Sequence, residues 1–278
     1  NKKRGKGSIT TNKGNYTGDW KNNQRHGEGT ISYSDGSKYV GHWSQNKMSG
    51  TGTFTDNNGH RYVGNWANGL REGKGTYTYV GDKMNKVING DFLYYSGSRY
   101  VGEWKENRFH GKGSFKYLDG GSYEGTWNMD KRNGEGIYNS PSGEHYEGEW
   151  KNDKKYGYGE MDFTNGDRYV GEWKDEQING KGKRIYTNGD RYDGEWKNNQ
   201  KHGKGMYIYN NGDQYNGSWE QDIKLGQGIQ KYVNGDSYKG DWNNGIKEGY
   251  GIFTDIKGNS YEGNWKNDLR TGEGVYKY

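Results

Sequence analysis

The sequence contains no cysteine and a single proline, Pro141, among its 278 residues. The absence of cysteine excludes disulfide bonds and thiolate metal sites, and it is typical of a reducing, intracellular compartment. No apolar run approaches the roughly 20 residues of a membrane-spanning helix, and no apolar core of a signal peptide is visible. Because proline is nearly absent, little in the sequence interrupts a β-ladder. We therefore expect a soluble chain that can form extended β-structure.

Hydrophobic residues are also scarce. They make up 27% of the chain, too few to fill one globular core for a sequence of this length. Aromatic residues nevertheless make up 16%, and the net charge is only +5, so the composition is not that of a disordered tail. We expect an elongated structure in which each part buries its aromatic side chains against its neighbours.

The aromatic residues follow one motif, Tyr-x-Gly-x-Trp, which occurs eleven times and contains all 11 tryptophans. Nine of the ten intervals between copies are 23 residues long, and one, from Tyr62 to Tyr100, is 38. A fixed period of this kind indicates stacked structural units, so we expect one continuous array over residues 1–278. Three central copies represent the repeated framework: Tyr146, Gly148, Trp150; Tyr169, Gly171, Trp173; and Tyr192, Gly194, Trp196.

Each repeat is predicted to form a β-hairpin. The Tyr, Gly and Trp of the motif stand two residues apart and therefore face one side of a strand. Seven residues after each Trp comes Gly-x-Gly, after which alternation resumes in a second strand. Asn-Gly or Asp-Gly before the next motif predicts the tight turn, and the other connection, as in 197–202, is interpreted as longer and basic. We expect the Gly-x-Gly glycines to leave room for Tyr and Trp rings.

The succession Tyr-x-Gly-x-Trp-Lys-Asn, Gly-x-Gly and Asn-Gly-Asp resembles the MORN repeat (membrane occupation and recognition nexus) over essentially the whole chain. The resemblance implies an all-β fold, an elongated single-layer antiparallel sheet of consecutive β-hairpins, twisted and curved. It also implies a role in binding and spacing. MORN arrays occur in radial spoke heads of cilia, in protist cytoskeletal scaffolds, in junctophilins that tether membranes, and beside kinase or methyltransferase domains.

The long interval is the first departure from the repeat. It holds an insertion or a degenerate unit near residues 80–91. An insertion at a hairpin turn would project from one edge of the sheet, where Met84, Val87 and Ile88 are candidate partner contacts. The alternative, which we favour slightly, is a degenerate unit, because Ile88-Asn-Gly90 occupies the register of Gly-x-Gly.

The second departure lies on the aromatic face. The residue two positions after Gly-x-Gly is aromatic in most repeats but is Arg184 and Gln230 in two. Either these polar residues form a local contact site, or their strands have slipped by one residue onto the apolar neighbours Ile185 and Ile229. We favour the slip.

No residue set predicts an enzyme. His26, His110 and His202 occupy the same position in three repeats, whereas a catalytic triad or a metal site needs unlike residues that converge once. Gly-x-Gly lacks the following helix and the basic partner of a phosphate-binding loop. We expect no catalytic, cofactor or metal site. The basic residues form no groove of one sign, so we expect no nucleic-acid partner.

Lysines near the connections are candidate lipid-binding residues, because they recur along one edge that could meet an anionic phosphoinositide membrane. The alternative is a solvated edge that prevents sheets from aggregating. The interspersed acids, 36 against 41 basic residues, favour this alternative. The lysines are Lys151, Lys154, Lys155, Lys197 and Lys201.

The sequence thus predicts a non-enzymatic structural scaffold and protein–protein interaction module of a cytoskeletal assembly, with a radial-spoke-head-like place in a ciliary axoneme as the first guess from the resemblance. The partner would be a helix or an extended segment of another protein, or a second copy, on the aromatic face. The alternatives are a peripheral membrane tether and the regulatory repeat region of a longer enzyme. The candidate aromatic contacts are Phe115, Tyr117, Phe163, Tyr207 and Tyr209.

Overall fold

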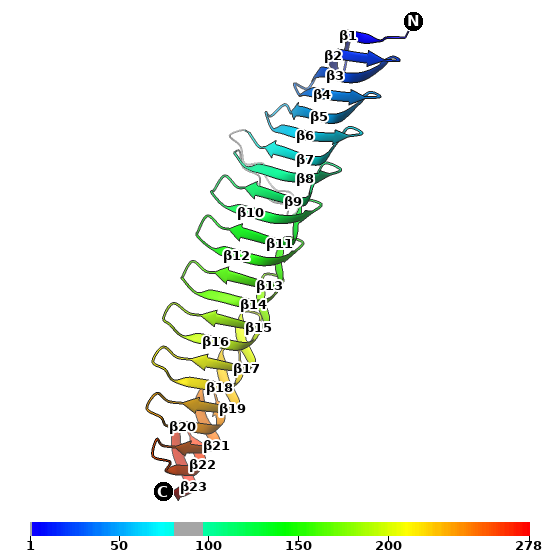
Figure 1. Cartoon of the computed structure of the whole chain (residues 1–278). Coiled ribbons are helices and arrows are strands. Elements are labelled where there is room, and N and C mark those ends of the chain that lie inside the picture. The colour runs from blue at the N-terminus through cyan, green and yellow to red at the C-terminus, as the bar shows by residue number, and fades with distance from the viewer. Residues whose placement is uncertain (1, 81–96) are drawn as a thin grey trace. The chain divides into compact units, whose positions relative to one another are not determined.

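A computed structural model describes residues 2–80 and 97–278 (Figure 1). These residues form 23 β-strands and no helix. The strands make a single open antiparallel sheet in chain order, which confirms the predicted all-β fold of consecutive hairpins. Met84, Val87 and Ile88 lie outside the described residues, as does nearly all of the predicted insertion. No apolar helix of membrane-spanning length occurs in the described ranges.

The strands are short and similar in length. In chain order they are β1 (Gly5–Thr11), β2 (Gly14–Lys21), β3 (Gln24–Tyr33), β4 (Lys38–Ser44), β5 (Lys47–Thr55), β6 (Arg61–Ala67), β7 (Leu70–Thr78), β8 (Arg99–Lys105), β9 (Arg108–Lys116), β10 (Ser122–Asn128), β11 (Lys131–Asn139), β12 (His145–Lys151), β13 (Lys154–Asp162), β14 (Arg168–Lys174), β15 (Gln177–Ile185), β16 (Arg191–Lys197), β17 (Gln200–Ile208), β18 (Gln214–Glu220), β19 (Ile223–Lys231), β20 (Ser237–Asn243), β21 (Ile246–Thr254), β22 (Ser260–Lys266) and β23 (Leu269–Lys277).

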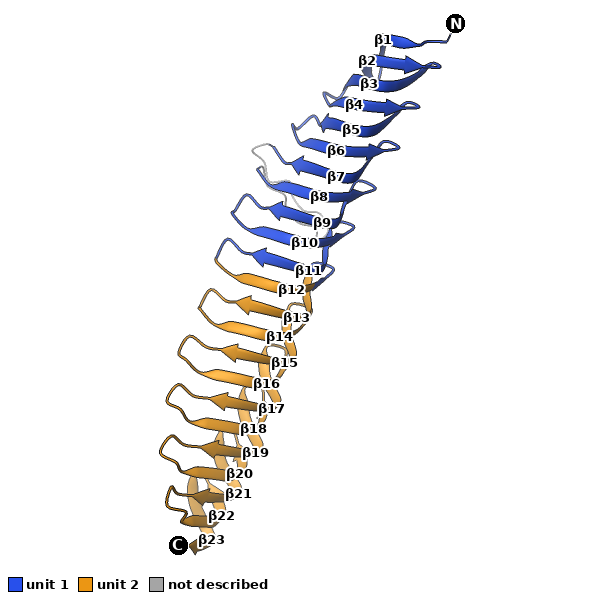
Figure 2. Cartoon of the chain, viewed as in Figure 1, with its two compact units in different colours: residues 1–142, 150–153 blue, residues 143–149, 154–278 orange. Residues whose placement is uncertain are grey.

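The strands belong to two compact units (Figure 2). Unit 1 contains residues 1–142 and 150–153, and unit 2 contains residues 143–149 and 154–278. Both are built from the same two-strand repeat, in which the strand carrying Tyr-x-Gly-x-Trp pairs with the Gly-x-Gly strand on either side, as β14 pairs with β13 and β15. Each unit therefore repeats one set of local contacts.

The two connections of a repeat are the reverse of the predicted ones. Between β16 and β17 there are only two residues, Asn198 and Asn199, with φ of 51° and 67°. The Asn-Gly connection is a five-residue loop, 209–213, in which the N–H of Tyr209 donates to the carbonyl of Asp213 over 2.9 Å. Asn and Asp tolerate the left-handed region, so a pair of them closes a two-residue hairpin without glycine. The prediction that Asn-Gly marks the tight turn was wrong.

The motif residues pack on one face, which we call the inner face. In β14, Tyr169 is fully buried and Trp173 is 5% exposed. The Tyr169 hydroxyl donates to the carbonyl of Glu172 over 3.0 Å, so the ring lies across Gly171 and Gly182, which pair between β14 and β15. A Cβ on Gly171 would stand 2.5 Å from the Tyr169 hydroxyl. The space left by these glycines is filled by the tyrosine, as predicted.

The first glycine of Gly-x-Gly has a different role. Gly180 has a φ of +101° and lies where the pairing of β14 with β15 shifts between Gly171 and Trp173. This shift is a β-bulge, which bends the strand and requires a residue that adopts positive φ. A Cβ on Gly180 would meet the Glu172 side chain, not a ring. The predicted ring-accommodating role was therefore wrong for this position.

Tryptophan joins one repeat to the preceding one. The indole Nε1 of Trp196 donates to the carbonyl of Gly182 over 3.0 Å, and that of Trp173 donates to Gly159 over 3.3 Å. The Tyr169 ring packs edge-on against Trp173 and Trp196, with centroids 5.3 and 5.7 Å apart. The residues common to all repeats thus form the contacts between repeats. Tyr146, Gly148, Trp150, Tyr192 and Gly194 occupy the equivalent positions in their strands.

The strands of Arg184 and Gln230 have not slipped. Arg184 pairs with Tyr169, and Gln230 pairs with Tyr215, in the register of the other repeats. Ile185 and Ile229 remain on the opposite face, 48% and 37% exposed. The favoured interpretation was therefore wrong. Both polar side chains stay on the inner face because each has a hydrogen-bonding partner there.

Candidate functional site

A row of cations follows the inner face. The residue five positions after the motif Trp is Arg or Lys in eight of the eleven repeats. Arg132 is typical: its guanidinium lies 4.0 Å from the Trp150 ring centroid and 5.7 Å from that of Tyr123. Cations over aromatic faces are attracted by the ring quadrupole. The eight residues are Arg25, Arg71, Arg132, Lys155, Lys201, Lys224, Lys247 and Arg270.

The cations are held by the two-residue turn of the next repeat. Lys201 pairs with Asp222 over 3.4 Å, and its backbone N–H donates to the same carboxylate over 2.9 Å. Lys155 makes the equivalent pair with Glu176, and the backbone N–H of Glu176 donates to the Lys155 carbonyl. In most repeats, the cation therefore contacts the side chain of the second residue of this turn. Sequence reasoning missed the row, because it treated Lys155 and Lys201 as lipid-binding or solvated residues of a connection and did not consider most of the others. The sequence pattern that could have revealed the row is the constant spacing of five residues between the motif Trp and the cation.

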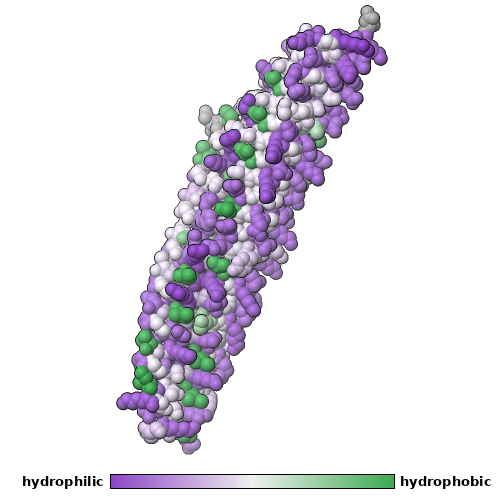
Figure 3. All heavy atoms as spheres, in the orientation of Figure 1, coloured by the Kyte–Doolittle hydropathy of each residue, from purple (hydrophilic) through white to green (hydrophobic). Residues whose placement is uncertain are grey.

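The candidate lipid-binding lysines separate into two groups. Only 15% of the Lys155 side chain and 14% of the Lys201 side chain are exposed, because both lie over aromatic rings and pair with carboxylates. Lys151, Lys154 and Lys197 are exposed. The five lysines therefore do not share one solvent-facing surface. In the face shown in Figure 3, hydrophilic residues predominate and apolar ones are scattered.

The candidate aromatic contacts also differ in access. Phe115 is fully buried, packed against Phe109 and Trp127 with ring centroids 6.0 and 6.3 Å apart. It offers no surface to a partner, so this prediction is corrected. The other candidates are half-buried on the inner face and retain accessible surface: Tyr117, Phe163, Tyr207 and Tyr209.

Arg184 forms an ion pair within the inner face. Its Nη2 and Nε donate to Oδ2 of Asp167 over 2.7 and 3.0 Å, and its guanidinium lies 4.8 Å from the Phe163 ring centroid. The N–H and hydroxyl of Thr187 donate to Oδ1 of the same carboxylate. Burial alone would raise the pKa of Asp167, but hydrogen bonds from Thr187 and Arg184 outweigh it and hold that pKa below its usual value.

Removing this carboxylate is expected to destabilise unit 2. Asp167→Ala leaves Arg184 unpaired with only 20% of its side chain exposed, and we expect a loss of about 2 kcal/mol at pH 7. The matched control is Asp193→Ala, which breaks a pair with Lys183 whose side chains are 71% and 53% exposed and should cost under about 0.5 kcal/mol.

Urea unfolding of both variants measures the difference. Because the folded pKa of Asp167 is lowered, its contribution is complete above the unfolded value of about 3.9 and is lost as pH falls through the folded value. The Asp167→Ala deficit should therefore shrink in acid. Equal losses for the two variants at pH 7 would contradict the assignment.

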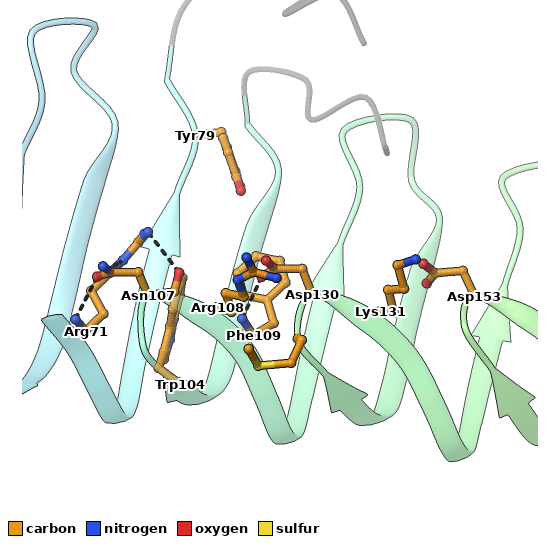
Figure 4. Close-up of a pocket in the computed structure, with 10 residues that line it drawn as sticks. Arg71, Tyr79, Trp104, Asn107, Arg108, Phe109, Asp130, Lys131 and Asp153 are labelled. Atoms are coloured by element: carbon orange, nitrogen blue, oxygen red, sulfur yellow. Dashed lines mark hydrogen bonds between the residues drawn. The ribbon is translucent and has the colours of Figure 1, made fainter. Parts of the chain in front are cut away.

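Two neighbouring cavities occupy the inner face of unit 1. One, of about 480 Å³, lies beside Phe109, and Figure 4 shows its lining side chains on one side of the bent strands. The other, of about 310 Å³, lies beside Met48 and Gly69. Arg71 and Asn107 line both. The remaining lining residues of the larger cavity are Tyr79, Trp104, Arg108, Met129, Asp130, Lys131 and Asp153, and those of the smaller are Phe54, Trp66 and Tyr77.

Arg71 is fixed between these cavities. Its Nη2 donates to the carbonyl of Asn107 over 3.0 Å, its backbone N–H donates to Oδ1 of the same residue over 2.8 Å, and its guanidinium lies 4.5 Å from the Trp104 ring centroid. Burial lowers its pKa from the ordinary arginine value. The cavities therefore combine aromatic walls with a fixed cation, an arrangement suited to holding side chains of a bound segment.

A third cavity, of about 370 Å³, lies in unit 2 between β19 and β21. Lys224, Gln230 and Lys247 line it. No group of three or more His, Asp or Glu side chains placed to hold a metal ion occurs in residues 2–80 and 97–278. The three cavities of the inner face thus differ in their lining residues.

A family model described as the MORN repeat matches eleven consecutive segments: residues 16–38, 39–61, 62–82, 100–122, 123–145, 146–168, 169–191, 192–214, 215–237, 238–260 and 261–278. No curated protein matches the sequence.

Several solved structures show a distant likeness. The TCP10 domain of CPAP from Danio rerio in complex with a STIL peptide has a TM-score of 0.39 at 10% identity, with 84% of this chain and 92% of that chain covered. The SAS-4 TCP domain from Drosophila melanogaster, in complex with a proline-rich motif, has a TM-score of 0.26 at 13% identity, covering 75% and 86%. Virginiamycin B lyase from Staphylococcus aureus has a TM-score of 0.17 at 11% identity, covering 88% and 86%.

Proposed function

The chain belongs to the MORN repeat family, and we propose on this premise that it is a non-enzymatic scaffold whose inner face holds a helix or an extended segment of another protein. The array over residues 1–278 would act as one structural domain. The repeated framework would set the spacing of the bound segment, and the variable inner positions would select it.

One observation carries the proposal: the residues common to all repeats mainly pack against one another, whereas most of the residues that line the cavities differ between repeats. Tyr169, Gly171 and Trp173 contact only their own and neighbouring repeats. Met48, at the position usually held by a cation, lines a cavity in unit 1, and Gln230, at a position usually aromatic, lines one in unit 2. Sequence-specific recognition is therefore assigned to the variable residues.

The proposed setting of the scaffold rests on its membership of the family. MORN arrays occur in cytoskeletal assemblies, and we propose such an assembly in the cytoplasm, with a radial-spoke-head-like place in a ciliary axoneme as the first to test. Self-association through the inner face is the other protein–protein outcome. Membrane tethering stays a prediction without a favouring observation, because Lys155 and Lys201 are already engaged by rings and carboxylates. A regulatory role beside a catalytic domain likewise stays a prediction.

Site-specific photocrosslinking tests the proposal. A benzophenone side chain replaces Tyr209, which is half-buried on the inner face, or Tyr158, which is 59% exposed on the opposite face and pairs with Glu172. In an extract of the native cell, we expect one protein to be crosslinked at least tenfold more from position 209. Crosslinks of equal yield from both positions, or none from either, would contradict inner-face binding.

A further inference from the structure

Lys224 in β19 lies in an aromatic surround on the inner face. Its ammonium is 4.5 Å from the Tyr215 ring centroid, 4.7 Å from that of Trp242 and 5.2 Å from that of Tyr209. It donates one hydrogen bond, to Oε1 of Gln230 over 2.9 Å. Among the described residues, no carboxylate lies within 4.0 Å of the Lys224 ammonium. The ammonium therefore retains donors that are not used in an ion pair.

The missing carboxylate is explained by the turn. In the preceding repeat, Asp222 is the second turn residue and pairs with Lys201. The equivalent residue for Lys224 is Gly245, whose backbone N–H donates to the Lys224 carbonyl over 3.0 Å but which has no side chain. A Cβ added at Gly245 would meet nothing within 4 Å. The space that a turn carboxylate would enter is therefore open.

Lys224 also lines the cavity of about 370 Å³ in unit 2. A second cation, Lys247, lines the same cavity, with its ammonium 5.4 Å from the Tyr232 ring centroid, and also makes no ion pair in the described part of the chain. Two acids line the cavity as well. Asp213 accepts a hydrogen bond from the N–H of Val233, and Asp268 accepts one from the N–H of Lys247. One carboxylate oxygen of each acid is thus engaged by a backbone N–H.

Burial lowers the pKa of Lys224 to about 8, with Asp213 and Asp268 opposing this effect and Lys247 adding to it. At neutral pH the ammonium is therefore mostly charged and partly stripped of water, so an incoming anion gains its full attraction at a reduced desolvation cost. The two acids repel a dianion more strongly than a monoanion. A monoanion that accepts from two ammonium groups fits this arrangement.

We propose that the cavity around Lys224 and Lys247 binds a carboxylate, the side chain of a Glu or Asp in the segment held by the inner face. The part of this inference that assigns the carboxylate to a bound protein segment rests on the proposed function. The carboxylate occupies the place that Asp222 takes beside Lys201, while the rings of Tyr209 and Tyr232 enclose the stem of the acidic side chain.

Lysine side-chain NMR tests the subsite directly. The probe is N-acetyl-glutamate N-methylamide, and the neutral control is the corresponding glutamine compound at equal ionic strength. We expect the ¹³Cε signals of Lys224 and Lys247 to shift with a dissociation constant in the millimolar range, and the pKa of Lys224 to rise from about 8. The control compound and inorganic phosphate should shift them at least tenfold less.

Variants at Gly245 separate charge from shape. Gly245→Asp supplies the missing carboxylate and should weaken probe binding at least tenfold, whereas Gly245→Asn adds a neutral side chain of the same size. Both residues are compatible with positive φ at this turn position, as Asp222 and Asn199 show with φ of 68° and 67°. Lys201, already paired with Asp222, is the internal reference and should not respond.

Three results would overturn the inference: equal shifts of Lys201 and Lys224, unchanged probe binding in Gly245→Asp, or tighter binding of phosphate than of the glutamate compound. These results are independent of partner capture. If the probe binds but no protein is crosslinked from position 209, the proposed function fails and the carboxylate subsite stands. If a protein is crosslinked from position 209 but the probe does not bind, the carboxylate subsite fails and the proposed function stands.

Discussion

Replacing Gly240 by alanine is expected to unfold the hairpin of β20 and β21, with a loss of more than about 3 kcal/mol. The added methyl group would lie 2.5 Å from the Cα of Gly251, 2.5 Å from the Tyr238 hydroxyl and 2.6 Å from the carbonyl of Tyr250. Two of these atoms are backbone in the paired strand, so relief requires the strands to separate. Urea unfolding followed by tryptophan fluorescence gives the free energy.

The matched control is Gly245→Ala in the turn of the same hairpin. Gly245 has a φ of +82° and no atom within 4 Å of an added Cβ. This change carries only the cost of the left-handed backbone, about 1–2 kcal/mol. We expect Gly240→Ala to be clearly the more damaging. A smaller loss for Gly240→Ala would show that the interlock between tyrosine and the paired glycines is not tight.

Replacing Trp173 by alanine is expected to cost about 3–5 kcal/mol, the range for removing a large buried aromatic side chain. The indole packs edge-on against Tyr146 and Tyr169, with centroids 5.5 and 5.3 Å apart, and donates to the carbonyl of Gly159. Because each repeat contacts only its neighbours, the loss should divide the cooperative unfolding of unit 2 into separate steps.

Hydrogen exchange locates this effect. We expect protection to fall in β13 to β15 and to persist in β20 to β22. The control is Trp20→Ala, in which the indole is only half-buried against the terminal strand β1 and donates to the carbonyl of Gly7. Its loss should be smaller than that of Trp173→Ala. Uniform loss of protection across unit 2 would contradict nearest-neighbour stacking.

The fold was predictable because its determinants are local and periodic. Tyr, Gly and Trp at alternate positions specify one face of a strand, and their return after 23 residues specifies the stacking of the units. The lengths of the turns were not predicted correctly. Asn-Gly and pairs of Asn or Asp both favour positive φ, so residue preference alone does not show which connection is the two-residue turn. Only the strand ends distinguish a two-residue connection at Asn198 from a five-residue one at 209–213.

The candidate site was predictable only in part. Tyr207 and Tyr209 were placed correctly on the inner face, but Phe115 is covered by other rings, which depends on packing between repeats. The cation row was missed because hydropathy places Arg and Lys at the surface, whereas their long stems lie along aromatic rings. Arg184 was misjudged for a different reason, because its partner Asp167 is 17 residues away in the sequence and adjacent only after folding.

The turn side chain that holds most of the cations has a consequence for engineering. Its presence or absence is decided by one turn residue, which is Gly245 for Lys224 but Glu176 for Lys155 and Asp222 for Lys201. Because that residue is outside the interlocked framework, its exchange should open or close a pocket without disturbing the stack. We therefore expect that a pocket can be moved from one repeat to another by exchanging a single turn residue.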